Sequence, residues 1–257
     1  MILDEIIRRT EKRVALLPET YPEDGIRAHV SLVDAIRNRS GKNAVIAEIK
    51  CASPSRGTIR RNVDMAMMAG ALAGSGCVAL SVLTEPYFFG GTGGDIAKVE
   101  SAVSIPVLRK DFIIDEHQLA ETRALGADAV LLIAAVLLIA AVLKERLPLF
   151  VTLAQEYGLE PLVEVHNAEE IKTALTTRAE LIGINNRNLA TLTIDRSTTR
   201  LLSESIRLTG RTIVSESGMR SADDIREMKP YCDAFLIGSS IMTHERPEKK
   251  LEEFVCA

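Results

Sequence analysis

The feature that most constrains the fold of this chain is a series of short apolar runs, each followed by a longer segment with helical periodicity. Most of the runs are almost continuously apolar, which is typical of parallel strands covered on both faces. Strands that alternate with helices indicate βαβ units and a parallel sheet. The eight runs are Ala44–Lys50, Val78–Leu83, Ile105–Lys110, a region near Ala129–Ala135, Pro161–His166, Leu181–Asn185, Thr212–Glu216 and Ala234–Gly238.

Eight strand–helix units predict a (β/α)8 TIM barrel. The chain has 257 residues, 47% of them hydrophobic, which suits one barrel with a sizeable core. We therefore expect residues 1–257 to form a single domain. Helical patterns at Ile2–Leu17 and Val30–Arg39 precede the first strand. A plain barrel does not need them, so residues 1–43 are interpreted as an N-terminal helical extension of the same domain, placed to close one end of the barrel.

Residues that favour helix starts precede several of the helical segments. Asp115 is expected to cap the segment EHQLAETRAL. Asn167 with Glu170, and Ser221 with Asp224, each combine an N-cap residue with an acidic residue three positions later. For the second pair we expect only the N-cap role, because the capping box proper uses Glu or Gln.

Charge and composition exclude several classes of protein. The net charge of −4 and the pI of about 5.7 argue against nucleic-acid binding. The four cysteines have no CxxC spacing, so we expect reduced thiols in a cytoplasmic protein, with no metal site or disulfide framework. The N-terminus lacks the apolar region of a signal peptide. The longest uncharged apolar run, Ala129–Leu143, has 15 residues. A bilayer span needs about 20, so we expect no membrane segment.

An exact tandem repeat lies in the region of the expected fourth strand. Leu131–Val136 and Leu137–Val142 both read LLIAAV, which favours a duplication, natural or engineered. Because a shift of six residues is even, a strand that slides by one copy keeps its two faces. We hypothesise that either copy can form the strand. With the first copy in place, the surplus enters the loop or helix at the active-site end. With the second, it bulges at the opposite end.

Charged side chains cluster at the ends of the expected strands, where a parallel barrel places its active site. A charge inside an apolar strand is costly unless it is paired or used. Glu48 and Lys50 are two positions apart and therefore share one strand face. We predict that one group converges on the barrel mouth and that its members push each other's pKa values apart, namely Glu48, Lys50, Lys110, Glu164 and Glu216.

Two Gly–Ser turns follow the seventh and eighth strands. They are Ser217-Gly218 and Gly238-Ser239-Ser240. Loops at these two barrel positions commonly bind phosphate through backbone N–H groups, and glycine lets the backbone approach the anion closely. The sequence therefore predicts a phosphate site.

Several longer segments carry a family resemblance. They are Ile46–Gly57 (IAEIKCASPSRG), Val82–Gly91 (VLTEPYFFGG), Val107–Gln118 (VLRKDFIIDEHQ), Leu162–Glu170 (LVEVHNAEE), Ile182–Leu192 (IGINNRNLATL), Val214–Met219 (VSESGM) and Phe235–Met242 (FLIGSSIM). The ExKxxSPS, LRKDF and GINNRNL patterns occur together and in family order. The chain resembles indole-3-glycerol phosphate synthase from its N-terminal helices to its last barrel helix, except at the repeat, where one copy would suffice.

The resemblance implies a carboxy-lyase, that is, a carbon–carbon lyase, of tryptophan biosynthesis. Such an enzyme closes the ring of 1-(2-carboxyphenylamino)-1-deoxyribulose 5-phosphate and removes carbon dioxide and water to give indole-3-glycerol phosphate. It implies no metal or organic cofactor, and its partner is the phosphorylated small-molecule substrate. We expect a monomer.

The resemblance also implies roles for single residues. Lys110 is the general acid that protonates the ribulose carbonyl, and Glu164 is its partner in the later dehydration. Lys50 holds the substrate carboxylate and shares in proton transfer, with Glu48 close enough to tune it. The division of acid and base roles among the two lysines and Glu164 stays open. The expected substrate contacts are Asn185 and Arg187 for the anthranilate part, Glu216 and Ser217 as pocket lining, and Ser53, Gly218, Gly238 and Ser239 for the phosphate.

The aromatic and histidine side chains have less certain assignments. Family position puts Phe89 and Phe112 beside the mouth, where they either pack on the aromatic substrate or serve the structure. The four histidines lack a ligand cluster and are not expected to be catalytic, namely His29, His117, His166 and His244.

Two alternative functions follow from the same sequence. The first is another phosphate-binding barrel of the pathway, such as phosphoribosylanthranilate isomerase or the tryptophan synthase alpha subunit. The Glu48/Lys50 pair, the LRKDF segment and the N-terminal extension favour the synthase. The second is an impaired or inactive scaffold whose duplicated strand occupies either of two registers, because six surplus apolar residues beside an active-site strand could displace Lys110 or Glu164. We expect the fold to survive the repeat and the synthase activity to be reduced by it.

Overall fold

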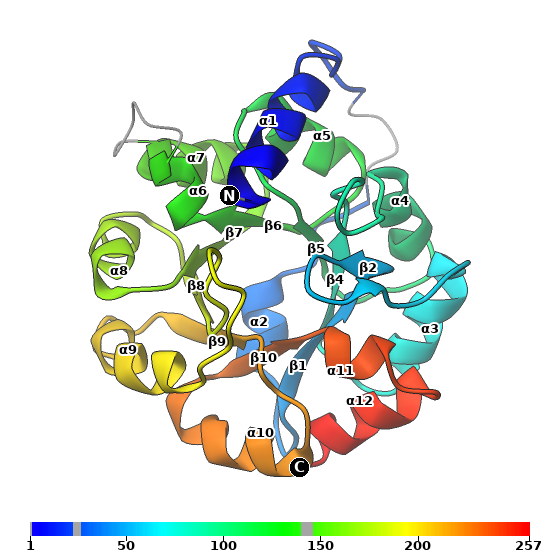
Figure 1. Cartoon of the computed structure of the whole chain (residues 1–257), viewed down its shortest axis with the longest axis vertical. Helices are drawn as coiled ribbons and strands as arrows, with labels where there is room; N and C mark the ends of the chain where they lie inside the picture. Colours follow the sequence, from blue (N-terminus) through cyan, green and yellow to red (C-terminus); the bar gives the residue numbers. More distant parts are fainter. Residues whose placement is uncertain (1, 23–26, 140–145) are drawn as a thin grey trace.

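The structure is a computed structural model that describes residues 2–22, 27–139 and 146–257, and a closed barrel of parallel strands forms its centre (Figure 1). The order of strands around the barrel is β1-β10-β9-β8-β7-β6-β5-β4. The strands are β1 (Ala44–Ile49), β4 (Ala79–Leu83), β5 (Val107–Lys110), β6 (Ala129–Ile133), β7 (Glu160–Val165), β8 (Leu181–Asn185), β9 (Thr212–Glu216) and β10 (Ala234–Ile237). The predicted (β/α)8 barrel is confirmed, and no strand boundary differs by more than two residues from its prediction.

Helices lie outside the barrel between successive strands (Figure 1). They are α3 (Met65–Gly74), α4 (Gly94–Glu100), α5 (His117–Ala124), α6 (Ala134–Ile139), α7 (Arg146–Glu156), α8 (Ala168–Leu175), α9 (Ser197–Arg207), α10 (Ala222–Met228), α11 (Ser239–Met242) and α12 (Pro247–Val255). A short antiparallel pair, β2 (Ala52–Ser53) and β3 (Gly57–Thr58), follows β1 and was not predicted. Within the described ranges, no helix is both long and apolar enough to cross a membrane.

The two faces of the strands build two separate cores. Ile46, Leu131 and Leu236 belong to the core inside the barrel. Val45 and Leu132 belong to the larger core between the sheet and the helices. Because both faces are buried, the strands read as continuous apolar runs in the sequence.

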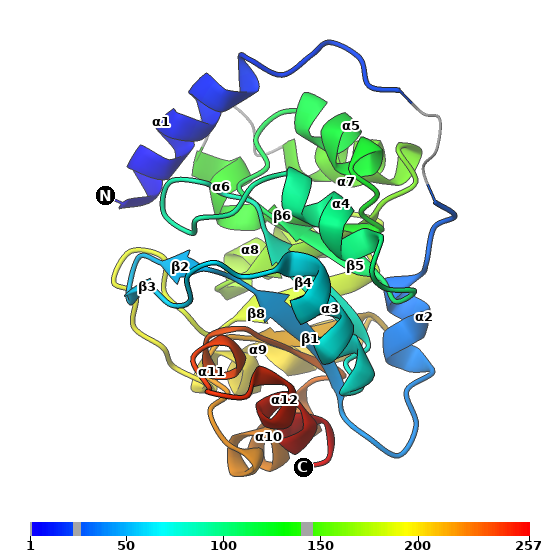
Figure 2. The same cartoon turned by 90° about the vertical axis from the view of Figure 1, so that its right-hand side faces the viewer.

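The N-terminal extension covers both ends of the barrel, whereas the sequence predicted closure of one. Helix α2 (Leu32–Arg37) lies at the amino ends of the strands (Figure 2). There the Leu32 and Val33 N–H groups donate to the Glu160 carboxylate at the start of β7, at 2.8 and 2.9 Å. Arg37 donates to Thr212 at the start of β9.

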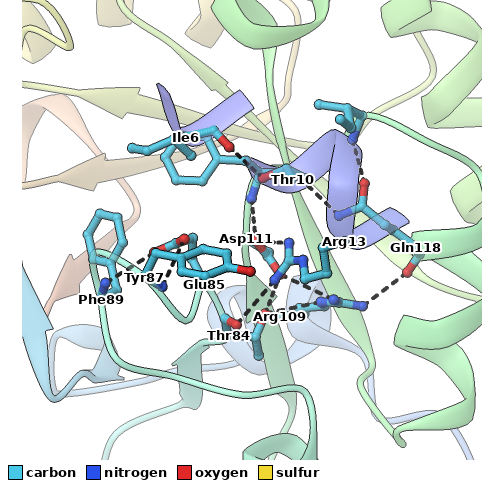
Figure 3. Close-up of polar contacts among 12 residues, drawn as sticks. Ile6, Thr10, Arg13, Thr84, Glu85, Tyr87, Phe89, Arg109, Asp111 and Gln118 are labelled. Atoms are coloured by element: carbon cyan, nitrogen blue, oxygen red, sulfur yellow. Dashed lines mark hydrogen bonds and ion pairs between the residues drawn. The ribbon is translucent and has the colours of Figure 1, made fainter. Parts of the chain in front are cut away.

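Helix α1 (Ile2–Val14) lies at the opposite end, where the strands finish (Figures 2 and 3). Arg13 on α1 donates to Asp111 over 2.8 Å, and Asp111 directly follows Lys110. The other oxygen of the buried Asp111 carboxylate accepts from Thr84 and Arg109, at 2.6 and 3.1 Å. The Arg9 guanidinium stacks over the Tyr87 ring at 4.8 Å. The extension therefore fastens α1 to the rim of the mouth.

The structure confirms some of the predicted N-cap residues and corrects others. The Asn167 side chain accepts from the Glu170 N–H, as predicted. Ser221 and Asp224 form a complete capping box, so the expectation of an N-cap role alone was too narrow. Helix α5 has Glu116 at its N-cap, so the prediction of Asp115 was wrong by one residue. The Asp115 carboxylate still accepts from the His117 N–H, at 3.0 Å.

The first copy of the repeat provides the strand. Leu131–Ile133 complete β6, and Ala134–Val136 begin α6. Leu137–Ile139 of the second copy continue α6, and residues 140–142 lie outside the described residues. The surplus therefore follows the strand at its active-site end, as expected for a strand built from the first copy. A duplication origin and exchange between the copies stay hypotheses.

Candidate active site

A cavity of about 590 Å³ lies at the carboxyl ends of the strands. Most of the predicted site residues line it, namely Glu48, Lys50, Phe89, Lys110, Phe112, Glu164, Asn185, Arg187, Ser217, Gly218, Gly238 and Ser239. Glu216 is fully buried and does not line the cavity itself. It forms an ion pair with Lys110, which does. Ser53 lines a smaller adjoining cavity of about 90 Å³, together with Ile2, Leu3 and Ile6 of α1. The structure thus gathers the predicted residues at one mouth.

Lys110 is the centre of the charged cluster. Its Nζ lies 2.7 Å from Glu216 Oε2, 3.5 Å from Glu48 Oε2 and 3.8 Å from Glu164 Oε2. Lys50 forms an ion pair with the other oxygen of Glu48. Two ammonium groups therefore face three buried carboxylates, which we call the lysine–carboxylate centre.

The three carboxylates of the centre differ in the direction in which their pKa values are shifted. Burial raises the pKa of Glu216 to about 8, because the nearby Lys110 charge does not offset the loss of water and the Glu164 charge. Burial also opposes ionisation of Glu164, but His166 and Lys110 outweigh it and hold the Glu164 pKa below its usual value. Lys50 and Lys110 likewise lower the Glu48 pKa against burial. The three carboxylates together raise the Lys110 pKa against the same burial.

Two glycines leave the room that these carboxylates occupy. A Cβ on Gly183 would lie 2.2 Å from Glu216 Oε1, and one on Gly238 would lie 2.1 Å from Glu48 Oε1. Real Cβ atoms do not approach so closely, so a side chain at either position would push a carboxylate out of place. Gly238 therefore has a packing role that the phosphate prediction did not include.

The end of β8 and two aromatic rings form another wall of the cavity. Asn185 Oδ1 accepts from the Arg187 N–H at 3.0 Å, and the Arg187 guanidinium donates to the Leu192 carbonyl at 3.1 Å. The rings of Phe89 and Phe112 lie 6.2 Å apart, centre to centre, and tilted by 39°. This wall combines an apolar surface with a cation.

The loops after β9 and β10, where the sequence predicted a phosphate site, both line the cavity. Ser217 and Gly218 both have positive φ, at 66° and 97°, which turns the backbone sharply toward the cavity. Helix α11 starts after Gly238 with no side-chain cap on its first N–H groups. The Ser53 hydroxyl nearby is buried and has no hydrogen-bond partner among the described residues. Arg56 and Arg220 also line the main cavity.

Sequence reasoning missed three functional candidates, Arg56, Arg220 and His166. Arg220 follows Gly218 by two positions, so its place in the loop after β9 was a usable signal. His166 follows Glu164 by two positions, and period-two alternation puts both on one strand face. His166 was set aside because it has no metal-ligand cluster around it. Its Nε2 lies 3.2 Å from Glu164 Oε1.

The fold and the site define a class, the (β/α)8 barrels with charged side chains gathered in a cavity at the carboxyl ends of the strands. Within that class, the chain belongs to the indole-3-glycerol phosphate synthase family, whose model matches residues 3–254. This confirms the family, the synthase function and the carboxy-lyase class expected from the sequence.

Relatives cover nearly the whole chain. An indole-3-glycerol phosphate synthase of Caldanaerobacter subterraneus is 40% identical over 259 residues, covering 99% of this chain and 98% of that protein. One of Bordetella pertussis is 41% identical over 249 residues, covering 96% and 92%. Among solved structures, the tryptophan synthase alpha chain of Legionella pneumophila matches with a TM-score of 0.60, 12% identity, and 86% and 94% coverage. That likeness shows the barrel fold alone and gives no support to the rival pathway function.

Proposed function

We propose that this chain is an active indole-3-glycerol phosphate synthase that uses the lysine–carboxylate centre for proton transfer. It closes the ring of 1-(2-carboxyphenylamino)-1-deoxyribulose 5-phosphate, with loss of carbon dioxide and then water. The observation that carries the proposal is the position of Lys110, whose ammonium lies within 3.8 Å of three buried carboxylates at the wall of the cavity.

Lys110 is the general acid for ring closure. As the aromatic carbon attacks the ribulose carbonyl carbon, the carbonyl oxygen gains negative charge and takes a proton from the ammonium. The surrounding carboxylates keep Lys110 charged before the reaction. They also stabilise the ammonium again when the proton returns.

Glu164 is the acid–base partner in the dehydration. Its lowered pKa makes it an ionised acceptor at neutral pH, and its carboxylate lies 3.8 Å from Lys110. A base at this position removes the proton that the substrate ring loses in the dehydration, and the hydroxyl group leaves as water after it receives a proton from an acid of the centre. The raised pKa of Glu216 keeps it protonated to higher pH than Glu48 and Glu164, and its Oε2 lies 2.7 Å from Lys110 Nζ.

The remaining residues bind the ends of the substrate. Lys50, fixed by Glu48, faces the cavity as the cation for the anthranilate carboxylate before it leaves as carbon dioxide. Asn185 and Arg187 orient the anthranilate part, and Phe89 with Phe112 packs on its ring. Ser53, Ser217, Gly218, Gly238 and Ser239 hold the phosphate, with Arg220 as an added cation.

Lys110→Ala and Glu164→Gln test the assignment directly. Each is expected to lower kcat by about 100-fold or more, the size of a lost general acid or base. The measurement is steady-state turnover followed by the fluorescence of the indole product, with far-UV circular dichroism as the check on folding. Near-full turnover by a folded variant would remove that residue from catalysis.

The oligomeric state and the location of the protein remain our predictions. We propose a monomer in the cytoplasm that binds no nucleic acid. Light scattering on the purified full chain tests the first point, since a dimer would give twice the monomer mass of 28.0 kDa.

A further inference from the structure

We infer that His166 is a positioning residue of the lysine–carboxylate centre. Charged and anchored by Glu170, it holds the Glu164 carboxylate ionised and turned toward Lys110. The inference rests on the proposed role of Glu164 in catalysis, and it adds a residue that the family resemblance did not assign.

The geometry is a chain of three groups that ends at the catalytic carboxylate. His166 Nδ1 lies 3.1 Å from Glu170 Oε2, and His166 Nε2 lies 3.2 Å from Glu164 Oε1. The other Glu164 oxygen, Oε2, lies 3.8 Å from Lys110 Nζ. Glu164 is therefore held between two cations, one at each of its oxygens.

Hydrogen bonds from the start of α8 hold the Glu170 carboxylate in place beside the His166 ring. Its Oε2 accepts from the His166 backbone N–H at 2.7 Å, and its Oε1 accepts from the Asn167 side-chain amide at 2.6 Å. Its own N–H donates to Asn167 Oδ1 at 3.0 Å, which closes the first turn of α8. This turn gives Glu170 one orientation, so the imidazole has a rigid anchor.

Burial and charge favour the imidazolium. The His166 side chain is 12% exposed, and burial opposes its charge. The two carboxylates outweigh that effect and raise the His166 pKa to about 10. The charged groups packed around the pair are Lys110 from β5 and Glu216 from β9. Asn185 from β8 is a neutral neighbour that also lowers the Glu164 pKa. The described side chains of α6, Ala134–Val136, bring no titratable group.

His166 is expected to act through Glu164 and not on the substrate. It is not among the residues that line either of the two cavities at the mouth. Its contact with Glu164 is an ion pair without a well-aligned hydrogen bond. Such contacts in an unliganded site often tighten only when substrate fills it. Lys110 lies closer to Glu216 and Glu48 than to Glu164, at 2.7 and 3.5 Å against 3.8 Å, whereas His166 lies 3.2 Å from Glu164, so His166 supplies a second cation for that carboxylate.

The test compares His166→Gln and Glu170→Gln with His117→Gln as the matched control. His117 also pairs with a carboxylate, Asp115 at 2.7 Å, but it lies on α5 away from both cavities. The readouts are kcat and KM for the carboxyphenylamino-deoxyribulose phosphate from pH 10 down to the lowest pH at which the chain stays folded, and NMR titration of the histidine rings in the full chain. The His166 signal is assigned by its loss in His166→Gln.

We expect His166→Gln to lower kcat by about 10- to 100-fold with little change in KM, as for other groups that orient a catalytic residue. The acid limb of its kcat profile should move to higher pH, because Glu164 loses a cation. Glu170→Gln should move that limb in the same direction by less, and His117→Gln should leave it unchanged. In the parent, the His166 ring should remain charged above pH 8.

Three results would overturn the inference. One is a folded His166→Gln with the kcat and the pH profile of an active parent. Another is a kcat pH profile equal to the parent's in Glu170→Gln, a variant that keeps the histidine and the backbone hydrogen bond from residue 170 to Asn167. The third is titration of His166 near its ordinary value of 6.5 in the parent. An inactive parent would instead count against the proposed function, and the NMR titration would still decide whether the two carboxylates hold His166 charged.

Discussion

The two copies of LLIAAV contain identical residues, yet they adopt different structures. Leu131, Leu132 and Ile133 are the last residues of β6, whereas Leu137, Leu138 and Ile139 lie in α6. Local propensity is the same for both copies, so it cannot explain the difference. The contacts of the surrounding chain decide the conformation of an apolar segment, as they commonly do when propensity is weak.

The first copy is a strand because a place in the sheet is available to it. Val130 pairs with Arg109 of β5, and Ile133 pairs with Glu164 of β7. Leu131 then faces the inside of the barrel and Leu132 the helices. The barrel is closed, so no free edge is left for the second copy. Strand β6 brings no polar group to the mouth, but it sets the spacing between Lys110 and Glu164 on its two neighbours.

The largest expected effect is a difference in stability between two variants, each with a charge placed at the same position of one copy. Leu132→Asp buries a carboxylate in the core between the sheet and the helices, where its neighbours are apolar. We expect this variant not to fold stably. The free-energy cost of burying an unpaired charge is comparable to or larger than the free energy of unfolding of a typical domain, ~5–15 kcal/mol. Leu138→Asp, at the matching position of the second copy, should cost less, because that position lies in α6 and has no place in the sheet.

Thermal and urea denaturation of the two purified variants measure that difference. A folded Leu132→Asp together with an unfolded Leu138→Asp would mean that the second copy forms the strand. Equal, moderate losses would indicate that the two copies exchange. Such marked variants are needed because removal of either copy leaves one and the same sequence.

The end of β9, unlike β6, carries a buried carboxylate, Glu216, that should make stability depend on pH. The folded-state pKa of Glu216 is raised from 4.5 to about 8. Its contribution to stability is therefore full below pH 4.5 and is lost as the pH rises through about 8. Glu216→Gln cannot titrate, so its melting temperature should fall by less than that of the parent between pH 5 and 8. Parallel curves for parent and variant across this range would show that Glu216 is not held protonated in the fold.

The sequence predicted the barrel because eight buried parallel strands leave a continuous apolar pattern. It missed β2 and β3, since strands of two residues carry no periodic signal. It also missed the division of the N-terminal extension between both ends of the barrel. That division depends on contacts such as Arg13 with Asp111, which join residues 98 positions apart.

The sequence predicted those residues of the candidate site that stand at the ends of the barrel strands. Lys110, Glu164 and Glu216 stand at the ends of apolar strands, and the barrel brings them together. His166 could have been found from its shared face with Glu164. Its pairing with Glu170 depends on the first turn of α8, which brings residue 170 back to residue 166. A search for metal-ligand patterns does not look for this kind of contact.

The most direct measurement is steady-state turnover of 1-(2-carboxyphenylamino)-1-deoxyribulose 5-phosphate by this chain and by a version that lacks one LLIAAV copy. A change of six residues after a strand alters the loop-closure entropy only slightly, and Lys110 and Glu164 already face each other across β6. We therefore predict turnover by both proteins, with kcat values within about tenfold of each other, or ~1.4 kcal/mol in barrier height. An inactive parent beside an active one-copy version would contradict the account, because the surplus would then have displaced the catalytic strand ends.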